Sequence, residues 1–166
     1  MTDGLKIVAR SLADAERELP KLDADDAVVS IGSPETKIPD GFDSSNPLHV
    51  RLQFDDVTTD TPAFGRERIR PPRRDHIEIL VTESENLLQA SLVYCHCAAG
   101  ISRSTAAAYI LHCIHRDPGE EEEAMKDVLD DNPFASPNRL MIEFADDILE
   151  RGGDMVTAVE TITRGM

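Results

Sequence analysis

The residues best suited to chemistry lie together in one short segment, His96-Cys97-Ala98-Ala99-Gly100-Ile101-Ser102-Arg103-Ser104. An apolar run, Leu92–Cys95, comes before it, and an alanine-rich stretch typical of a helix, residues 104–115, comes after it. A strand, a tight turn and a helix in this order aim backbone amides and the positive end of the helix dipole into one concavity, which favours an anion. A cysteine at the start of such a turn is stabilised as the thiolate, its nucleophilic form.

Two further residues of this segment suit phosphate binding. Gly100 allows the turn to take a positive φ. Arg103 follows Cys97 by six positions and can fold back to hold two phosphate oxygens with its planar guanidinium group. The pattern therefore predicts nucleophilic chemistry on a phosphate ester, with Cys97 as nucleophile and Arg103 as phosphate ligand.

The string His96-Cys-x-x-Gly-x-x-Arg103-Ser104 resembles the signature of the cysteine-based protein tyrosine phosphatase superfamily, particularly its compact dual-specificity branch. The resemblance implies that Cys97 forms a phosphocysteine intermediate and that Ser104 hydrogen-bonds its sulfur. It implies that His96 holds the loop and tunes the cysteine instead of acting as a base. It also implies that the phosphate oxygens are bound by the loop, namely by Ala98, Ala99, Gly100, Ile101, Ser102 and Arg103.

The implied reaction also needs a general acid, which in the superfamily is an aspartate on an upstream loop. Residues 48–54 alternate as a strand does, and Asp56 falls on the same side as Leu52 and Phe54. We therefore predict Asp56 as the acid, with Asp55 and Asp60 as alternatives. The separation from Cys97 is longer than is usual in compact members, and the chain has no tryptophan, so it lacks the Trp-Pro-Asp loop of the large tyrosine phosphatases. No cofactor and no metal are implied, since thiolate, arginine and aspartate supply the whole reaction.

The elements that must position these residues alternate between short apolar runs and helical patterns. Strands are predicted at residues 5–9, 27–31, 48–54 and 92–95, and helices from near Ser11, Asp75, Ser104, Pro118 and Pro137, with a last short helix at 156–162. This order predicts an α/β fold: one domain over residues 1–166, with a mainly parallel central sheet flanked by helices and the phosphate loop between a buried strand and a helix. Residues 55–74, with three prolines, are predicted to form a long loop.

Composition and charge limit the classes of molecule that this protein is expected to bind. The formal charge of −15, from 32 acidic and 17 basic residues, repels nucleic acid and anionic membranes. The amino terminus has no basic stretch before an apolar run, and no apolar segment approaches bilayer length, so a cytoplasmic protein is expected. The expected partner is a phosphorylated protein or another phosphomonoester. Superfamily members that act on inositol phosphates often carry lysines in this loop, whereas Ala98, Ala99, Ile101 and Ser102 are uncharged. The resemblance therefore implies a phosphoprotein-like substrate.

The remaining cysteines and a cluster of arginines could tune the site. The three cysteines form no paired spacing typical of zinc or of a disulfide framework. Cys95 and Cys113 are predicted to be buried core thiols, although Cys95 could also pair with an oxidised Cys97.

Five arginines lie within residues 66–74. They could attract an acidic phosphorylated substrate, but for most of them pairing with the protein's own carboxylates is favoured.

Two other functions fit parts of the pattern. A rhodanese-like sulfurtransferase also places a cysteine before a helix, but the His-Cys and Arg-Ser flanks argue against it. A non-catalytic module that binds phosphorylated partners would keep the loop and lack an acid in the right place. The intact pair of Cys97 and Arg103 argues against that second alternative.

Overall fold

The computed structural model describes residues 4–58 and 69–165. Four strands, β1 (Lys6–Arg10), β2 (Ala27–Gly32), β3 (His49–Gln53) and β4 (Leu92–His96), form a sheet in the order β1-β4-β2-β3. Every pairing between neighbouring strands is parallel. The predicted α/β class and parallel sheet are confirmed, and each strand lies within about a residue of its predicted position.

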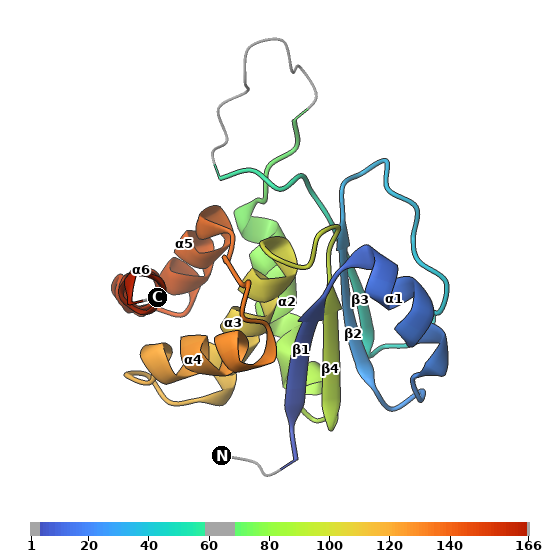
Figure 1. Cartoon of the computed structure of the whole chain (residues 1–166), viewed down its shortest axis with the longest axis horizontal. Helices are drawn as coiled ribbons and strands as arrows, with labels where there is room; N and C mark the ends of the chain where they lie inside the picture. The colour runs from blue at the N-terminus through green and yellow to red at the C-terminus, as the bar shows by residue number, and fades with distance from the viewer. Residues whose placement is uncertain (1–3, 59–68, 166) are drawn as a thin grey trace.

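Helices cover both faces of this sheet (Figure 1). On one face lie α1 (Leu12–Glu18) and the short 3₁₀ turn η1 (Leu19–Lys21). On the other lie α2 (Arg74–Leu87), α3 (Arg103–His115) and α4 (Glu121–Asp131), and α5 (Arg139–Ile148) and α6 (Asp154–Arg164) pack outside them. Among the helices of the described ranges, none has the length and apolar character needed to cross a bilayer.

The start of α2 corrects one detail of the prediction. The sequence predicts that this helix begins near Asp75, but the helix begins one residue earlier and Asp75 lies inside its first turn. Arg73 is the residue at the N-cap, and its backbone amide donates to His76 Nδ1 at 3.0 Å. A ring nitrogen three residues into the helix therefore closes this end.

Strand alternation divides the sheet into two apolar cores. Val29 and Cys95 face α2 and α3 in the larger core, whereas Val28 and Tyr94 face α1 in the smaller one. All six residues of β2 are buried, as expected for a central strand of a parallel sheet covered on both faces. The continuous apolar runs that the sequence shows for β2 and β4 follow from this double burial.

The register of the sheet brings one polar row to its carboxyl edge. Arg10 of β1 lies beside His96 of β4, His96 beside Ser30 of β2, and Ser30 beside Arg51 of β3. Parallel strands all end at the same edge, so the loop that follows β4 rises directly from this row. Four positions spread over 87 residues of sequence thereby become neighbours.

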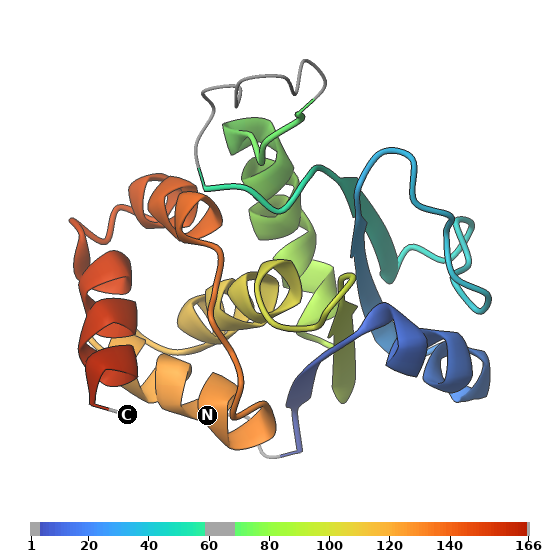
Figure 2. The same ribbon diagram turned by 45° about the horizontal axis from the view of Figure 1, so that its top comes forward.

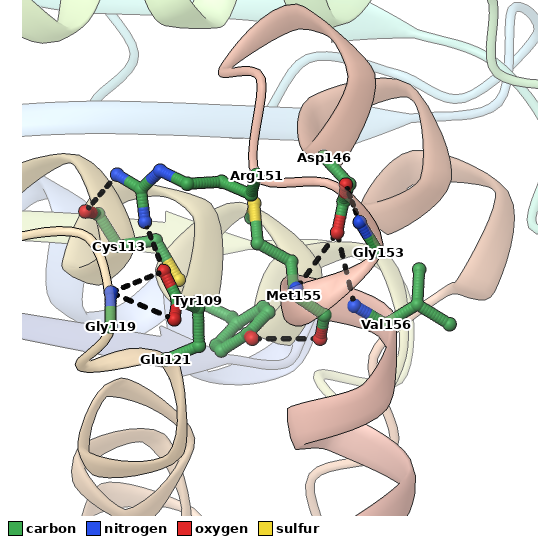
Figure 3. A network of polar contacts seen from close by, with 9 residues as sticks. All are labelled: Tyr109, Cys113, Gly119, Glu121, Asp146, Arg151, Gly153, Met155 and Val156. Carbon is green, nitrogen blue, oxygen red and sulfur yellow. Dashed lines mark hydrogen bonds and ion pairs between the residues drawn. The ribbon is translucent and has the colours of Figure 1, made fainter.

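A buried polar network fastens the far end of α3 to the C-terminal helices (Figure 3). Arg151 forms an ion pair with Glu121 and donates to the Cys113 carbonyl at 2.9 Å. Tyr109, from the middle of α3, donates its hydroxyl to the Met155 carbonyl at 2.8 Å. Because both charges and the phenol are buried, these contacts satisfy groups that would otherwise destabilise the fold.

Replacing Asp146 tests how far the stability of the C-terminal helices depends on this network. Its carboxylate accepts the amides of Gly153 and Met155 at 2.7 and 2.8 Å. We expect Asp146→Ala to lower the free energy of unfolding by about 1–3 kcal/mol, because the buried Met155 amide and the less buried Gly153 amide lose their acceptor. The adjacent Asp147→Ala removes only an exposed ion pair to Arg74 and should cost less than about 1 kcal/mol. Urea unfolding followed by circular dichroism measures both, and equal losses would contradict the assignment.

Candidate active site

The loop between β4 and α3 carries the predicted nucleophile and phosphate ligands. Cys97 follows the last residue of β4 and is only 2% exposed. Arg103 is the first residue of α3 and is 4% exposed. Figure 2 shows this loop between the β1–α1 connection and the segment that leads from α4 to α5. The structure therefore joins a buried strand to a helix in the way that the sequence predicts.

The carbonyl groups of this loop are held from outside by other parts of the chain. Their donors lie on the β1–α1 connection and on the segment before α5, namely Leu12 N to Ala98 O (3.0 Å), Asn132 Nδ2 to Gly100 O (2.7 Å), Ser136 N to Ile101 O (2.8 Å) and Asn138 N to Ser102 O (3.1 Å). For the amides of residues 98–103, by contrast, the described part of the chain supplies no acceptor. A row of amides at a helix N-terminus without protein acceptors is suited to bind an anion.

Gly100 is needed at this place for two reasons. Its φ is +76°, a conformation that side chains with a Cβ rarely adopt. A Cβ at this position would also lie 2.5 Å from Ser11 N and 2.6 Å from the Arg10 carbonyl carbon. The β1–α1 connection thus packs directly on the loop backbone, and only glycine permits the approach.

The Cys97 sulfur lies 3.2 Å from Ser104 Oγ. Ser104 is fully buried in the first turn of α3, so its hydroxyl is shielded from water and faces the sulfur. The amide of Cys97 donates to the Arg10 carbonyl at 3.3 Å. The sulfur is thereby placed at the base of the loop, next to a hydroxyl that can donate to a thiolate.

Arg103 is anchored on one edge of its guanidinium group. Nη1 donates to the Phe54 carbonyl at 2.7 Å and lies 3.4 Å from Ser33 Oγ. Its Nε is buried and has no partner among the described residues. A fork held on one side and unpartnered on the other suits bidentate binding of phosphate oxygens.

The structure distinguishes two of the three predicted acids. Asp56 Oδ1 accepts from Ser102 Oγ at 2.7 Å and from Asn138 Nδ2 at 2.9 Å, which puts this carboxylate at the rim of the loop. Asp55 instead closes the base of its own loop, exchanging hydrogen bonds with the backbone of Arg70 at 2.7 and 2.9 Å. Asp60 lies outside the described residues. The geometry therefore favours Asp56 over Asp55.

His96 is buried under the loop. Its Nε2 lies 2.6 Å from Ser30 Oγ, and its Nδ1 lies 3.4 Å from the Cys97 carbonyl oxygen. Burial lowers the pKa of His96 to about 4, and the charges of Arg51 and Arg103 act in the same direction. The imidazole is consequently neutral at physiological pH, and its contacts are those of a residue that holds the loop.

Three residues of the site were missed by sequence reasoning. Asn138 contacts both Asp56 and the loop while its Oδ1 caps α5 through Met141 N at 3.1 Å. The Ser-Pro-Asn turn before a helical pattern was the available signal for it. Ser30 was visible only as a lone polar residue in an apolar strand, and Arg51 carried no signal at all.

The other cysteines and the arginine cluster contribute less to the site. Cys95 and Cys113 are buried, and burial raises the pKa of both thiols, that of Cys113 to about 12. Arg74 pairs with Asp147 and Glu78, as the solvated alternative predicted, whereas residues 66–68 of the cluster lie outside the described ranges. Within residues 4–58 and 69–165, no group of three or more His, Cys, Asp or Glu side chains is arranged to hold a metal.

The sequence matches no protein-family model, and no match is found among curated proteins. Solved structures, however, share the fold. Human DUSP28 has a TM-score of 0.60 at 16% identity and covers 89% of this chain and 94% of its own. Tk-PTP in its active form has a TM-score of 0.52 at 22% identity, covering 87% and 90%. PTPMT1 in complex with PI(5)P has a TM-score of 0.52 at 19% identity, covering 89% and 94%.

The chain therefore has the fold of the protein tyrosine and dual-specificity phosphatases. At this level the resemblance carried by the His-Cys-x5-Arg-Ser string is confirmed. The likeness covers 89% of the chain for DUSP28 and 87% for Tk-PTP.

Replacing Gly100 tests the packing of the loop. We expect Gly100→Ala to weaken binding of orthovanadate, a phosphate analogue, by at least about tenfold, because the added Cβ forces the β1–α1 connection away. Its melting temperature should also fall. Gly119→Ala is the matched control: it has φ +100° but open space around its Cβ, so it carries the backbone strain without the clash. Calorimetry measures both effects, and equal behaviour of the two variants would refute the role given to close packing.

Proposed function

We propose that this protein is a phosphomonoester hydrolase that acts through a phosphocysteine on Cys97. The observation that carries the proposal is the arrangement of the β4–α3 loop: its carbonyls are held from outside, while residues 4–58 and 69–165 supply no acceptor for its amides. The buried sulfur of Cys97 and the unpartnered Nε of Arg103 belong to the same loop and helix.

The reaction divides into two steps. The Cys97 thiolate attacks phosphorus while the bond to the leaving oxygen breaks, and Asp56 gives its proton to that oxygen. Asp56 then takes a proton from water, which attacks phosphorus and displaces the sulfur as thiolate. Ser104 supports this departure by donating to the sulfur, and Arg103 with the loop amides holds the phosphoryl oxygens throughout.

Two features of the rim favour a phosphorylated protein as substrate. Ile101 and Phe134 are 41% and 79% exposed, and both line a hollow that borders the loop at Ala99 and Gly100. These apolar side chains can cover the residues that flank a phosphorylated side chain. PTPMT1 is known in complex with PI(5)P, but the present loop has no lysine and no arginine besides Arg103 to neutralise further phosphates on a headgroup.

The reaction is tested by hydrolysis of p-nitrophenyl phosphate and phosphotyrosine in EDTA. We expect turnover by the wild type and none by Cys97→Ser. Asp56→Asn should reduce kcat on phosphotyrosine by about 10²-fold or more, and less on p-nitrophenyl phosphate, whose leaving group needs little protonation. Asp55→Asn should retain activity because that carboxylate is engaged with the Arg70 backbone.

Other outcomes would redirect the proposal. Loss of activity in Asp55→Asn with retention in Asp56→Asn would move the acid to Asp55, and retention in both would leave Asp60. Absence of turnover together with tight phosphopeptide binding by the wild type would support the non-catalytic binding module. Transfer of sulfur from thiosulfate would support the rhodanese-like alternative.

Phe134 provides a test of the substrate class. We expect Phe134→Ala to lower kcat/KM about tenfold for a phosphotyrosine peptide with apolar flanking residues, corresponding to about 1.4 kcal/mol of lost apolar contact. Its activity on p-nitrophenyl phosphate should not change. Ile79→Ala, at another exposed apolar side chain on α2, is the control and should leave both substrates unaffected. Equal effects on peptide and small substrate would argue against a peptide-binding role.

A further inference from the structure

Arg51 holds a guanidinium group beneath the candidate site, and its hydrogen bonds within the described residues go to Ser30 and Thr36, not to the loop or to Cys97. Its Nη1 donates to Ser30 Oγ at 2.8 Å, and its Nη2 donates to the Thr36 carbonyl at 3.2 Å. Gly32 makes room for it, since a Cβ there would lie 2.7 Å from Nη2. Within residues 4–58 and 69–165 no carboxylate forms an ion pair with Arg51.

The position of Arg51 is electrostatically unfavourable. Burial lowers the pKa of Arg51, and the nearby charge of Arg103 lowers it further. A partly buried cation beside another cation destabilises the fold unless its hydrogen bonds compensate. Arg51 therefore has a position that apolar packing alone would not select.

The hydrogen bonds from Arg51 lead in one direction to Cys97. A carbonyl only accepts, so the 3.4 Å contact with the Cys97 oxygen requires the proton of the neutral His96 ring to be on Nδ1. The Nε2 atom is then an acceptor, and Ser30, 2.6 Å away, must donate its hydroxyl to it. Arg51 donates to the same Ser30 oxygen, which turns the hydroxyl proton away from the guanidinium and toward His96.

The chain of contacts ends on the peptide group that begins the loop. The Cys97 carbonyl receives His96 Nδ1–H, and the Cys97 amide donates to the Arg10 carbonyl at 3.3 Å. Both backbone groups of the nucleophile are therefore engaged. With the other tautomer of His96, a nitrogen lone pair would face the Cys97 carbonyl, and this contact would be repulsive.

We propose that Arg51 is a positioning residue for the nucleophile, acting through Ser30 and His96 to keep a hydrogen-bond donor on the Cys97 carbonyl. Arg51 selects the Nδ1–H tautomer, and the tautomer fixes the first peptide of the phosphate loop. The consequence for turnover rests on the proposed phosphatase function, whereas the tautomer itself does not.

The tautomer can be read without turnover, from long-range ¹H–¹⁵N correlation spectra of the imidazole rings. The wild type should show His96 Nε2 as an unprotonated nitrogen and Nδ1 as a protonated one, with the signals assigned by their loss in His96→Asn. Arg51→Met should shift His96 toward the Nε2–H form, and Arg51→Lys should restore the wild-type pattern. Arg139→Met, which removes an exposed arginine paired with Glu143 and Glu160, should leave the His96 signals unchanged.

Kinetics on p-nitrophenyl phosphate give the second readout. Arg51→Met and Ser30→Ala should each lower kcat by about tenfold with little change in KM, and Arg51→Lys should recover most of it. Because the two residues act in one chain, the double variant should lose no more than either single variant. Ser30→Ala reads the same chain if Arg51→Met fails to fold.

Three results would overturn the proposal: an unchanged His96 tautomer in Arg51→Met, losses in kcat that add in the double variant, or a rise in KM alone. The last of these would make Arg51 a substrate-phosphate ligand. A shifted tautomer in a protein without any turnover would uphold the chain of contacts and reject the proposed function instead.

Discussion

The β4–α3 loop can offer its amides to an anion only because other parts of the chain hold its carbonyls. Each residue of the loop has a backbone N–H donor and a backbone C=O acceptor, and both groups need hydrogen-bond partners. Here the β1–α1 connection, Asn132 after α4 and the turn before α5 take up the acceptors. Gly100 permits the first of these contacts, because any side chain at its position would collide with Ser11. Segments from both ends of the chain are thus needed to shape a loop in its middle.

Charge is distributed unevenly over this protein. The chain carries a formal charge of −15, yet two guanidinium groups, those of Arg51 and Arg103, lie close together beneath one loop. A phosphate dianion would meet repulsion at long range and strong local attraction at the loop, where burial reduces screening. Arg103 donates one hydrogen bond to the Phe54 carbonyl, and this bond fixes the guanidinium group before a ligand binds. Arg51 is fixed in the same way by Ser30 and Thr36.

Helix α3 connects the site to the C-terminal helices. Its first residues, Arg103 and Ser104, belong to the loop region, and its later residues, Tyr109 and Cys113, belong to the buried network of Figure 3. A helix tied down at both ends resists tilting, so the position of its N-terminus depends on packing about 15 Å further along its axis. The same C-terminal half supplies Asn138, which joins Asp56 to the loop. The helices that follow the signature are therefore part of what shapes the site.

Local pattern was enough to predict the parallel sheet, the order of the helices and the strand–loop–helix unit around Cys97, because apolar runs, helix periodicity and a glycine in a turn are properties of neighbouring residues. It also ranked Asp56 first among three aspartates by strand alternation, and the structure puts that carboxylate at the loop rim. It could not show that Asn138 reaches Asp56, or that Arg51, Ser30 and His96 form one row, since these contacts cross up to 82 residues of sequence. Strand order and register decide which side chains meet at the sheet edge, and both follow from the packing of the whole core. The sequence by itself thus determined which reactive residues the loop contains, and only the tertiary structure decided which distant residues orient the loop.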